Sequence, residues 1–323
     1  MNEAPLLEVK NLKKEFAVGR KWFGSTGVIQ SIDDVSFFVN RGETLGLVGE
    51  SGCGKSTLGR VILRLIPPTS GIIKYNGRNI EKLRNRELKP LRKEMQLIFQ
   101  DPFNSLNPKV TIGDAIAEPF EVHFPDKTQV EKMERIADLL KLVGLSTLQM
   151  SRYPHEFSSG QRQRIVLARA LALEPSLLVC DEPVSALDVS IQAQIINLLK
   201  DLQKKLSLTY IFISHDLSIV KHCSDRIAVM YLGKIIEIAD KKEFYISPLH
   251  PYSQALLSAI PIPDPTTRNK RIILKGDVPN PMQPPSGCPF RTRCQSVLKK
   301  CTQTMPPLMM VSSGHSVACH LMT

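Results

Sequence analysis

The sequence lacks a long apolar run and a secretory signal peptide. No stretch of the 323 residues approaches the ~18 apolar residues that a membrane-spanning helix requires. The N-terminal residues also lack the basic-then-apolar layout of a signal peptide. Hydrophobic residues make up 42% and charged residues 23%, which excludes a disordered, collagenous or coiled-coil chain. We expect a soluble, cytosolic protein with one large domain and an appendage.

Acidic residues are outnumbered by basic ones. The 42 Lys and Arg against 31 Asp and Glu give a net charge of +11. This excess favours anionic partners such as nucleic acid, phosphorylated ligands or the negatively charged inner face of a membrane. A solvated basic surface explains the charge equally well, so the charge alone does not decide the function.

Short apolar or alternating runs predict strands, and runs with helical spacing predict helices. The expected early strands cover residues 6–12, 33–39, 43–49, 71–76 and 95–99. The expected helices are 55–65, 129–145 and 160–173, and a hairpin loop is expected at 19–27. From residue 176 onward strands and helices alternate, which predicts a mainly parallel sheet wrapped by helices.

Residues 49–56 match a phosphate-binding motif. They read Gly-Glu-Ser-Gly-Cys-Gly-Lys-Ser and fit G-x-x-x-x-G-K-[ST], directly after a predicted strand and opening a predicted helix. The glycines allow backbone N–H groups to surround phosphates, and the helix N-terminus adds partial positive charge. Lys55 is expected to reach the β- and γ-phosphates, and the Ser56 hydroxyl to bind Mg²⁺.

Cys53 lies inside this loop, where the helix N-terminus is expected to lower the pKa of its thiol. We then expect alkylation of Cys53 to inactivate the protein and bound nucleotide to protect it. The alternative is a small side chain that the loop tolerates.

Two adjacent carboxylates end an apolar run at 177–180. A buried strand would bring Asp181 beside the phosphate loop, where it is expected to hold Mg²⁺. Glu182 lies one residue further, where it is expected to orient or deprotonate the attacking water. Two solvated acids at a strand end are the alternative.

Four further motifs carry a resemblance to a family. Residues 157–164 lie just before the acidic pair and resemble the signature sequence of ATP-binding-cassette (ABC) ATPases. Gln100 resembles the Q-loop of that family, residues 185–188 its D-loop, and His215 its switch histidine. The resemblance implies a P-loop NTPase fold of ABC type, with a mainly parallel sheet, an antiparallel β edge and a helical subdomain.

The resemblance also implies a mechanism that uses ATP and Mg²⁺. Two such subunits pair head to tail, so that the signature residues of one complete the ATP site of the other. The catalytic residues are then Glu182, His215 and Gln100, and the Mg²⁺ ligands are Ser56, Gln100 and Asp181. The implied ATP-binding residues are Phe16, Gly49, Glu50, Ser51, Gly52, Cys53, Gly54, Lys55, Ser56, Thr57, Ser158, Ser159, Gly160, Gln161 and Asp188.

Two of these assignments leave alternatives. Phe16 matches the aromatic that stacks on adenine, in a loop after the first strand, but a plain core role or replacement by Trp22 is possible. Ser159 stands where the family usually has Gly, and we expect the site to tolerate its side chain.

The chain more closely resembles the ATP-binding subunits of oligopeptide and dipeptide importers, of the F-type, with nickel importers as near relatives. The phrases that carry this resemblance cover 98–108, 152–165, 181–199 and 247–261. It implies an ATPase that powers peptide import from the cytoplasmic face of the cell membrane. Its implied partners are a second ATPase subunit (a D-type subunit or another copy), two permease subunits and, indirectly, an extracytoplasmic peptide-binding protein.

The preferred interpretation expects no nucleic acid as a partner. The alternative, from another functional class, is an ABC ATPase associated with nucleic acid. DNA-repair members insert a long coiled-coil arm between the phosphate loop and the signature. Here Lys55 and Ser158 are 103 residues apart, which leaves room only for a compact helical subdomain, at about 101–163.

Residues 261–323 form a separate C-terminal extension in this interpretation, after a nucleotide-binding domain of residues 1–260. The extension holds 10 of the 23 prolines and one aromatic residue, so it is expected to bury little core on its own. Its four cysteines are Cys288, Cys294, Cys301 and Cys319. Clustered thiols in a cytosolic chain suggest a soft metal centre rather than disulfides. The resemblance implies a [4Fe-4S] cluster; Zn²⁺ and unligated thiols are the alternatives.

Overall fold

The structure is a computed structural model that describes residues 4–18, 27–101, 105–261 and 271–322. The chain forms two compact units. Unit 1 comprises Met1–Lys82 and Phe212–Thr323, and unit 2 comprises Leu83–Ile211. Within the described ranges, no helix combines the length and the apolar character needed to cross a membrane.

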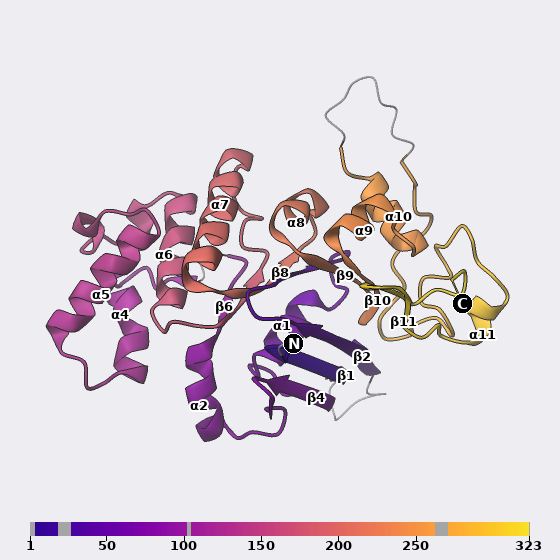
Figure 1. The fold of residues 1–323 in the computed structure, drawn as a ribbon, viewed down its shortest axis with the longest axis horizontal. Helices are drawn as coiled ribbons and strands as arrows, with labels where there is room; N and C mark the ends of the chain where they lie inside the picture. Colours follow the sequence, from indigo (N-terminus) through magenta and orange to yellow (C-terminus); the bar gives the residue numbers. More distant parts are fainter. Residues whose placement is uncertain (1–3, 19–26, 102–104, 262–270, 323) are drawn as a thin grey trace. The chain divides into compact units, whose positions relative to one another are not determined.

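One sheet of unit 1 is antiparallel, with strand order β2-β1-β4-β5 (Figure 1). Its strands are β1 (Leu7–Val18), β2 (Gly27–Val39), β4 (Ser70–Tyr75) and β5 (Arg78–Asn79). Side chains along β2 alternate between buried and more exposed positions, the pattern of a strand with one face on a core. This sheet is the predicted antiparallel edge. The hairpin loop expected at 19–27 falls, except for Gly27, outside the described residues.

The second group of strands in unit 1 has the order β11-β12-β10-β9-β3. Its strands are β3 (Thr44–Val48), β9 (Arg226–Tyr231), β10 (Lys234–Asp240), β11 (Met309–Ser312) and β12 (His315–Val317). β3 and β9 are parallel, and the pairings of β10, β11 and β12 are antiparallel. Every residue of β3 is buried, as its continuous apolar run predicts.

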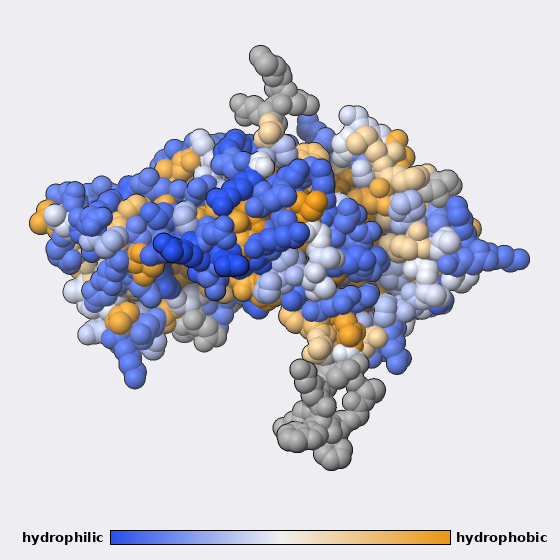
Figure 2. All heavy atoms as spheres, turned by 90° about the horizontal axis from the view of Figure 1, so that it is seen from below, coloured by the Kyte–Doolittle hydropathy of each residue, from blue (hydrophilic) through white to orange (hydrophobic). Residues whose placement is uncertain are grey.

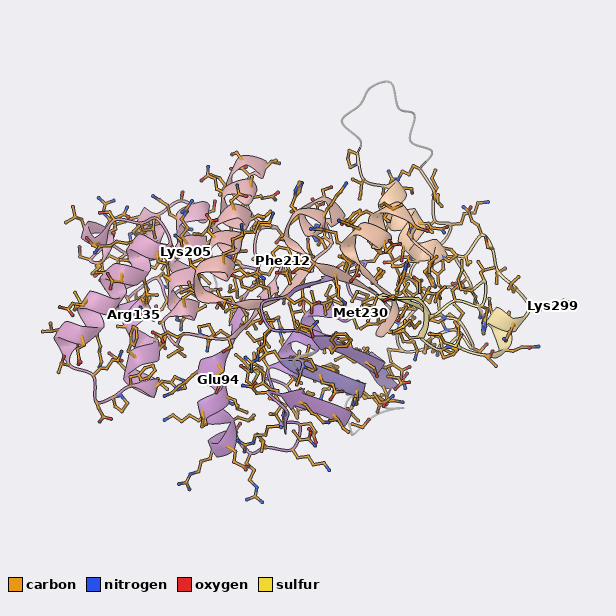
Figure 3. All side chains as sticks on the ribbon, in the orientation of Figure 1. Glu94, Arg135, Lys205, Phe212, Met230 and Lys299 are labelled. Atoms are coloured by element: carbon orange, nitrogen blue, oxygen red, sulfur yellow. The ribbon has the colours of Figure 1, made fainter. Side chains whose placement is uncertain are left out.

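Helices complete unit 1. They are α1 (Lys55–Ile62), α8 (Leu217–Cys223), α9 (Lys241–Ile246), α10 (Pro251–Ser258) and α11 (Lys300–Gln303). In Figure 3, Lys299 marks the outer side of the C-terminal extension beside α11.

The C-terminal extension buries its apolar residues against the rest of unit 1. Its strand β12 pairs with β10, and Val317, Ala318 and Phe290 are almost completely buried. A short strand that joins an existing sheet edge shares the core of that sheet and needs few apolar residues of its own.

Among the described residues, unit 2 contains the parallel pair β6 and β7 together with five α-helices and two short 3₁₀ helices. Its elements are α2 (Asn85–Glu94), β6 (Met95–Ile98), α4 (Ile112–His123), α5 (Gln129–Leu142), η1 (Thr147–Gln149), η2 (Pro154–Glu156), α6 (Ser159–Leu171), β7 (Leu177–Asp181) and α7 (Val189–Leu206). The strand β8 (Thr209–Ser214) runs from unit 2 into unit 1.

Three helices of unit 2, α4, α5 and α6, pack against one another. The N-terminal residues Thr111 and Thr128 cap α4 and α5 by accepting a hydrogen bond from the backbone N–H three residues later. The helix expected at 129–145 ends at Leu142 because Gly144 adopts a left-handed conformation (φ 74°) just after it.

Hydrophilic residues dominate the face of the molecule seen in Figure 2, and hydrophobic residues form smaller patches between them. This surface agrees with the globular composition of the sequence.

Candidate functional site

The predicted phosphate loop connects β3 to α1 in unit 1. Gly49 and Gly54 have φ angles of 152° and 107°, a region that side chains with a Cβ rarely adopt. A Cβ added at either residue would lie 2.2 Å from a backbone oxygen, that of Met230 or of Ser31. Met230, labelled in Figure 3, lies on β9. The strand–loop–helix context that the motif requires is therefore present.

The Lys55 side chain folds back onto this loop. Its Nζ donates to the backbone oxygens of Gly49 (2.7 Å) and Glu50 (2.9 Å), and the side chain is buried. Lys55 is also the first residue of α1, so its charge adds to the partial positive charge of the helix N-terminus. The remaining predicted phosphate-site residues are the exposed Ser51 and Gly52 at the loop tip and the half-buried Ser56 and Thr57 in the first turn of α1.

The thiol of Cys53 does not have the lowered pKa expected from its position. Cys53 is 4% exposed, and burial raises the pKa of its thiol, although the charge of Lys55 acts in the opposite direction. The expectation was wrong because desolvation of the thiolate outweighs the positive charges near it. A buried, protonated thiol is not a selective target for alkylation.

Two residues that the sequence analysis missed hold Glu50 of this loop. Arg293 donates through its two terminal nitrogens to the Glu50 carboxylate at 2.6 and 3.0 Å. The backbone N–H of Glu50 donates to the Tyr252 hydroxyl at 2.9 Å. Arg293 and Tyr252 are 243 and 202 positions from Glu50 in the sequence, and no local motif indicates that they contact it.

In unit 2, the side chains of Gln100 and Glu182 lie next to each other. The Gln100 side-chain amide donates to the Glu182 carboxylate at 2.8 Å. Glu182 has a φ of 48°, which costs free energy in a residue with a side chain and turns the chain sharply after β7. Asp181, the last residue of the fully buried β7, is 2% exposed.

The predicted signature residues open α6. Ser158 is the N-cap residue, and its Oγ accepts from the backbone N–H of Gln161 while the Gln161 side chain accepts from the backbone N–H of Ser158. Ser158 is exposed, and Ser159 begins the helix, where serine is tolerated. A Cβ at Gly160 would lie 2.5 Å from Ile191 Cγ2, so this position requires glycine for packing.

The other predicted residues are more scattered. Phe16 lies within β1 rather than in a loop after it, because β1 extends to Val18. Its ring is 36% exposed, and Lys14 Nζ lies 4.9 Å from the ring centroid. Its alternative, Trp22, lies outside the described residues. His215 is exposed directly after β8, and the exposed Asp188 is the N-cap residue of α7.

The four cysteines of the extension are neighbours in unit 1. Cys288, Cys301 and Cys319 are each 8% exposed, and the Cys288 backbone N–H donates to the Cys301 oxygen at 2.9 Å. Burial raises the pKa of Cys288 to about 11 and also raises the pKa values of Cys294 and Cys319. The other cysteines of the extension also raise these pKa values, to a smaller extent than burial does.

Across the described residues, no group of three or more His, Cys, Asp or Glu side chains is arranged to hold a metal ion.

A hollow of about 520 Å³ lies in unit 2, after the Gln100 loop. Its lining residues include Ser105, Asn107, Pro108, Glu118 and Arg169. Arg169 donates to the Ser105 backbone oxygen at 2.8 Å and pairs with Glu118 at 2.6 Å, which fixes the polar side of the hollow.

Comparison with known families gives two matches. Residues 32–185 match the family model described as ABC transporter. Residues 236–301 match the model described as oligopeptide/dipeptide transporter, C-terminal region.

Full-length relatives and solved structures point in the same direction. The chain is 53% identical to the putative oligopeptide transport ATP-binding protein YkfD of Bacillus subtilis, over 99% of this chain and 97% of the relative. It is 51% identical to the oligopeptide transport ATP-binding protein AppF of the same organism, over 99% and 98%. A dimeric, post-hydrolysis ATP-binding cassette, MJ0796 bound to ADP and Pi, matches with a TM-score of 0.65 at 26% identity, over 73% of this chain and 98% of that structure. CbiO1 from Clostridium perfringens, part of the ABC transporter complex cbiONQ, matches with the same score at 28% identity, over 76% and 92%.

Proposed function

Because this chain belongs to the family of ABC transporter ATP-binding proteins, we propose that it is the ATP-hydrolysing subunit of an oligopeptide or dipeptide importer. One observation carries the proposal: a glycine-constrained phosphate loop with Lys55 folded onto it occurs in the same chain as a stretch matching the C-terminal region of peptide transporters. In this proposal residues 1–260 form the nucleotide-binding domain and 261–323 the extension.

The loop and α1 bind the phosphates of ATP. Backbone N–H groups between Gly49 and Gly54 surround the anion, and Lys55 exchanges its two backbone acceptors for phosphate oxygens. Phe16 stacks on the adenine, since its ring is partly exposed on β1.

Oxygen atoms are available for Mg²⁺, which prefers oxygen ligands. The residues that would hold Mg²⁺ are Ser56 through its hydroxyl at the start of α1, Asp181 through its carboxylate at the end of β7, and Gln100 through its amide oxygen. When bound, Mg²⁺ would supply positive charge against the phosphates.

Glu182 acts as the general base. Its left-handed backbone and the hydrogen bond from Gln100 fix the orientation of the carboxylate. The carboxylate is therefore already oriented to accept a proton from the attacking water. His215, exposed directly after β8, contacts the γ-phosphate in this proposal. Gln100 also senses whether metal and phosphate are present.

The signature helix serves a second subunit. Ser158 and the first turn of α6 are exposed, which suits a helix N-terminus that completes the anion site of another cassette. Asp188, exposed at the start of α7, also faces that subunit. The second cassette is a D-type subunit or a copy of this chain.

The hollow lined by Ser105 and Arg169 receives a segment of a permease. Its lining begins five positions after Gln100 in the sequence, which supports a role in linking the nucleotide site to the membrane partner. The chain thereby works at the cytoplasmic face of the membrane, and an extracytoplasmic binding protein selects the peptide.

The four cysteines of the extension hold a [4Fe-4S] cluster in this proposal. The mutual proximity of Cys288, Cys294, Cys301 and Cys319 supports it, as does thiolate ligation as the ordinary chemistry of such clusters. The cluster would stabilise one conformation of a proline-rich segment. Iron and acid-labile sulfide analysis of anaerobically purified protein should give about four of each per chain. Stoichiometric zinc, or protein without metal but with a folded extension, would exclude the cluster.

Reconstitution with the permeases tests the proposed function. Peptide and its binding protein, added to vesicles that contain the complete transporter, should stimulate ATP hydrolysis, and DNA or RNA should not. Stimulation of the isolated subunit by nucleic acid, with no response to permeases and peptide, would favour a nucleic-acid-associated ATPase instead.

A further inference from the structure

A carboxylate lies in the loop that binds phosphates, and an arginine from the extension pairs with it. Glu50 directly follows Gly49, and Arg293 lies about 30 residues before the C-terminus of the chain. Arg293 donates to both carboxylate oxygens of Glu50, at 2.6 and 3.0 Å. The Arg293 side chain is 8% exposed and that of Glu50 27%, so water only partly screens this pair.

The extension holds Arg293 in place through an aromatic cluster. The Arg293 backbone N–H donates to the Phe290 oxygen at 2.9 Å, which forms a tight turn. The Phe290 ring is buried and packs against Tyr231 and Tyr252, with centroid distances of 5.3 and 5.4 Å. Tyr252 also accepts the hydrogen bond from the Glu50 backbone N–H. One cluster therefore fixes both the main chain of Glu50 and the cation that pairs with its side chain.

An unpaired carboxylate at position 50 would oppose nucleotide binding. ATP carries several negative charges on its phosphates, and like charges at short range repel in a partly desolvated site. Arg293 removes this repulsion by neutralising Glu50, and its bidentate geometry prevents the carboxylate from turning toward the phosphates.

We propose that Arg293 is a positioning residue of the nucleotide site, through which the C-terminal extension sets the affinity of the phosphate loop for ATP. The inference rests on the ATP binding assigned under the proposed function, and it does not require a metal cluster. It makes the extension a part of the nucleotide site rather than an independent appendage.

Equilibrium binding to the full-length chain tests this inference. A Glu182→Gln background slows hydrolysis, so calorimetry can measure the affinities for ATP, ADP and adenosine. In this background the variants are Arg293→Ala, Arg293→Met, which retains much of the side-chain volume, and a double variant that combines Arg293→Met with Glu50→Gln. Arg291→Ala is the matched control, because Arg291 pairs with Ser286 within the extension.

Loss of Arg293 should weaken ATP binding about tenfold, weaken ADP binding less and leave adenosine binding unchanged, because the effect depends on phosphate charge. Glu50→Gln should restore most of the ATP affinity lost in Arg293→Met. Arg291→Ala should bind like the parent chain. Thermal unfolding of each variant shows whether it is folded, and Arg293→Met stands in for Arg293→Ala if the latter unfolds.

Wild-type ATP affinity in folded Arg293→Met would overturn the inference. Equal weakening for ATP and adenosine, or a double variant no better than Arg293→Met, would also overturn it, since either result indicates a general structural role. A parent chain that binds no ATP would remove the proposed function and this inference together. A parent chain that binds ATP, with variants that bind equally well, would remove this inference alone.

Discussion

Glu182 illustrates how much of the proposed chemistry depends on single side chains. The residue has a left-handed backbone, an uncommon conformation for a glutamate, and its carboxylate accepts a hydrogen bond from Gln100. Strain of this kind persists only where the surrounding structure enforces it, and it is concentrated at functional sites. The fully buried strand β7, which ends at Asp181, supplies that support.

Replacement of Glu182 by Gln should retain ATP binding and reduce turnover at least about 100-fold, because an amide cannot accept the proton that a carboxylate accepts. Phosphate release and ATP binding, measured on the same preparation, check this. The ATP-bound variant should also accumulate as a dimer in size-exclusion chromatography.

Glu174→Gln is the matched control. Glu174 belongs to the same unit, has positive φ as well, and pairs with Arg135 on the surface (labelled in Figure 3). It should keep wild-type turnover, since exposed ion pairs contribute little. A fully active Glu182→Gln protein would contradict the assignment of the general base.

The sequence could predict those site residues that lie together in short motifs. The phosphate loop, Asp181 and Glu182 lie in short motifs with a fixed relation to a strand or helix, so their local geometry follows from a few residues. Arg293 and Tyr252 could not be predicted, because they reach Glu50 through the fold of the whole of unit 1. The pKa of Cys53 was predicted in the wrong direction because the sequence shows charges but not burial.

At the scale of elements, the start of α10 joins the cassette to the extension. His250 is the N-cap residue of α10, and its Nδ1 accepts from the Tyr252 backbone N–H at 3.0 Å. Its ring is buried and lies 5.5 Å from that of Phe290. Burial lowers the pKa of His250 to about 3.

This lowered pKa predicts acid sensitivity. Between pH 6.5 and 3 the unfolded chain binds a proton at residue 250 that the folded chain excludes, so this contribution to stability is lost as the pH falls through that range. Asparagine is also a good N-cap residue and does not titrate. Between pH 7 and 5, the wild type should lose roughly 2 kcal/mol more unfolding free energy than His250→Asn.

Urea unfolding at the two pH values measures the difference. The exposed His222, at the end of α8, provides the control, and His222→Asn should keep the wild-type pH dependence. Parallel pH profiles for the wild type and His250→Asn would show that His250 does not contribute to acid sensitivity.

The strand β12 is fixed to β10 by a buried pair. His315 Nε2 lies 2.7 Å from the Glu237 carboxylate, and the two side chains are 3% and 0% exposed. Glu237 also accepts from the backbone N–H groups of Leu249 and His250, so one carboxylate joins β10, β12 and the start of α10.

His315→Ala should reduce the unfolding free energy by about 3 kcal/mol, because it leaves part of a buried carboxylate without a partner. Urea unfolding measures this value. Ser312→Ala on the exposed strand β11 should change it by no more than about 0.5 kcal/mol. A loss for His315→Ala as small as that of the control would show that the pair does not anchor the extension.

Strand positions in the cassette were predictable, but their lengths were less so. The strand predicted at 43–49 is Thr44–Val48, whereas those predicted at 6–12 and 33–39 extend over Leu7–Val18 and Gly27–Val39, because the two pair with each other beyond their apolar runs. The strands β11 and β12 were not predicted, because the short strand β12 gains its core by pairing with β10.

At the scale of the whole molecule, the chain carries two elements that in this proposal belong to two different ATP sites, a phosphate loop and a signature helix. Unit 1 holds the phosphate loop with Lys55, and unit 2 holds the signature helix α6, whose N-cap residue Ser158 is exposed. In the proposed mechanism one subunit's loop and another's signature residues bind the same γ-phosphate. One solved relative is a dimer, in agreement with this proposal.

Turnover per chain as a function of dilution tests that claim most directly. The rate of ATP hydrolysis per chain should fall as the purified protein is diluted, and it should rise again when more of this cassette, or a D-type cassette, is added. A single diluted chain that hydrolyses ATP at its maximal rate, whatever the concentration of other cassettes, would contradict the account.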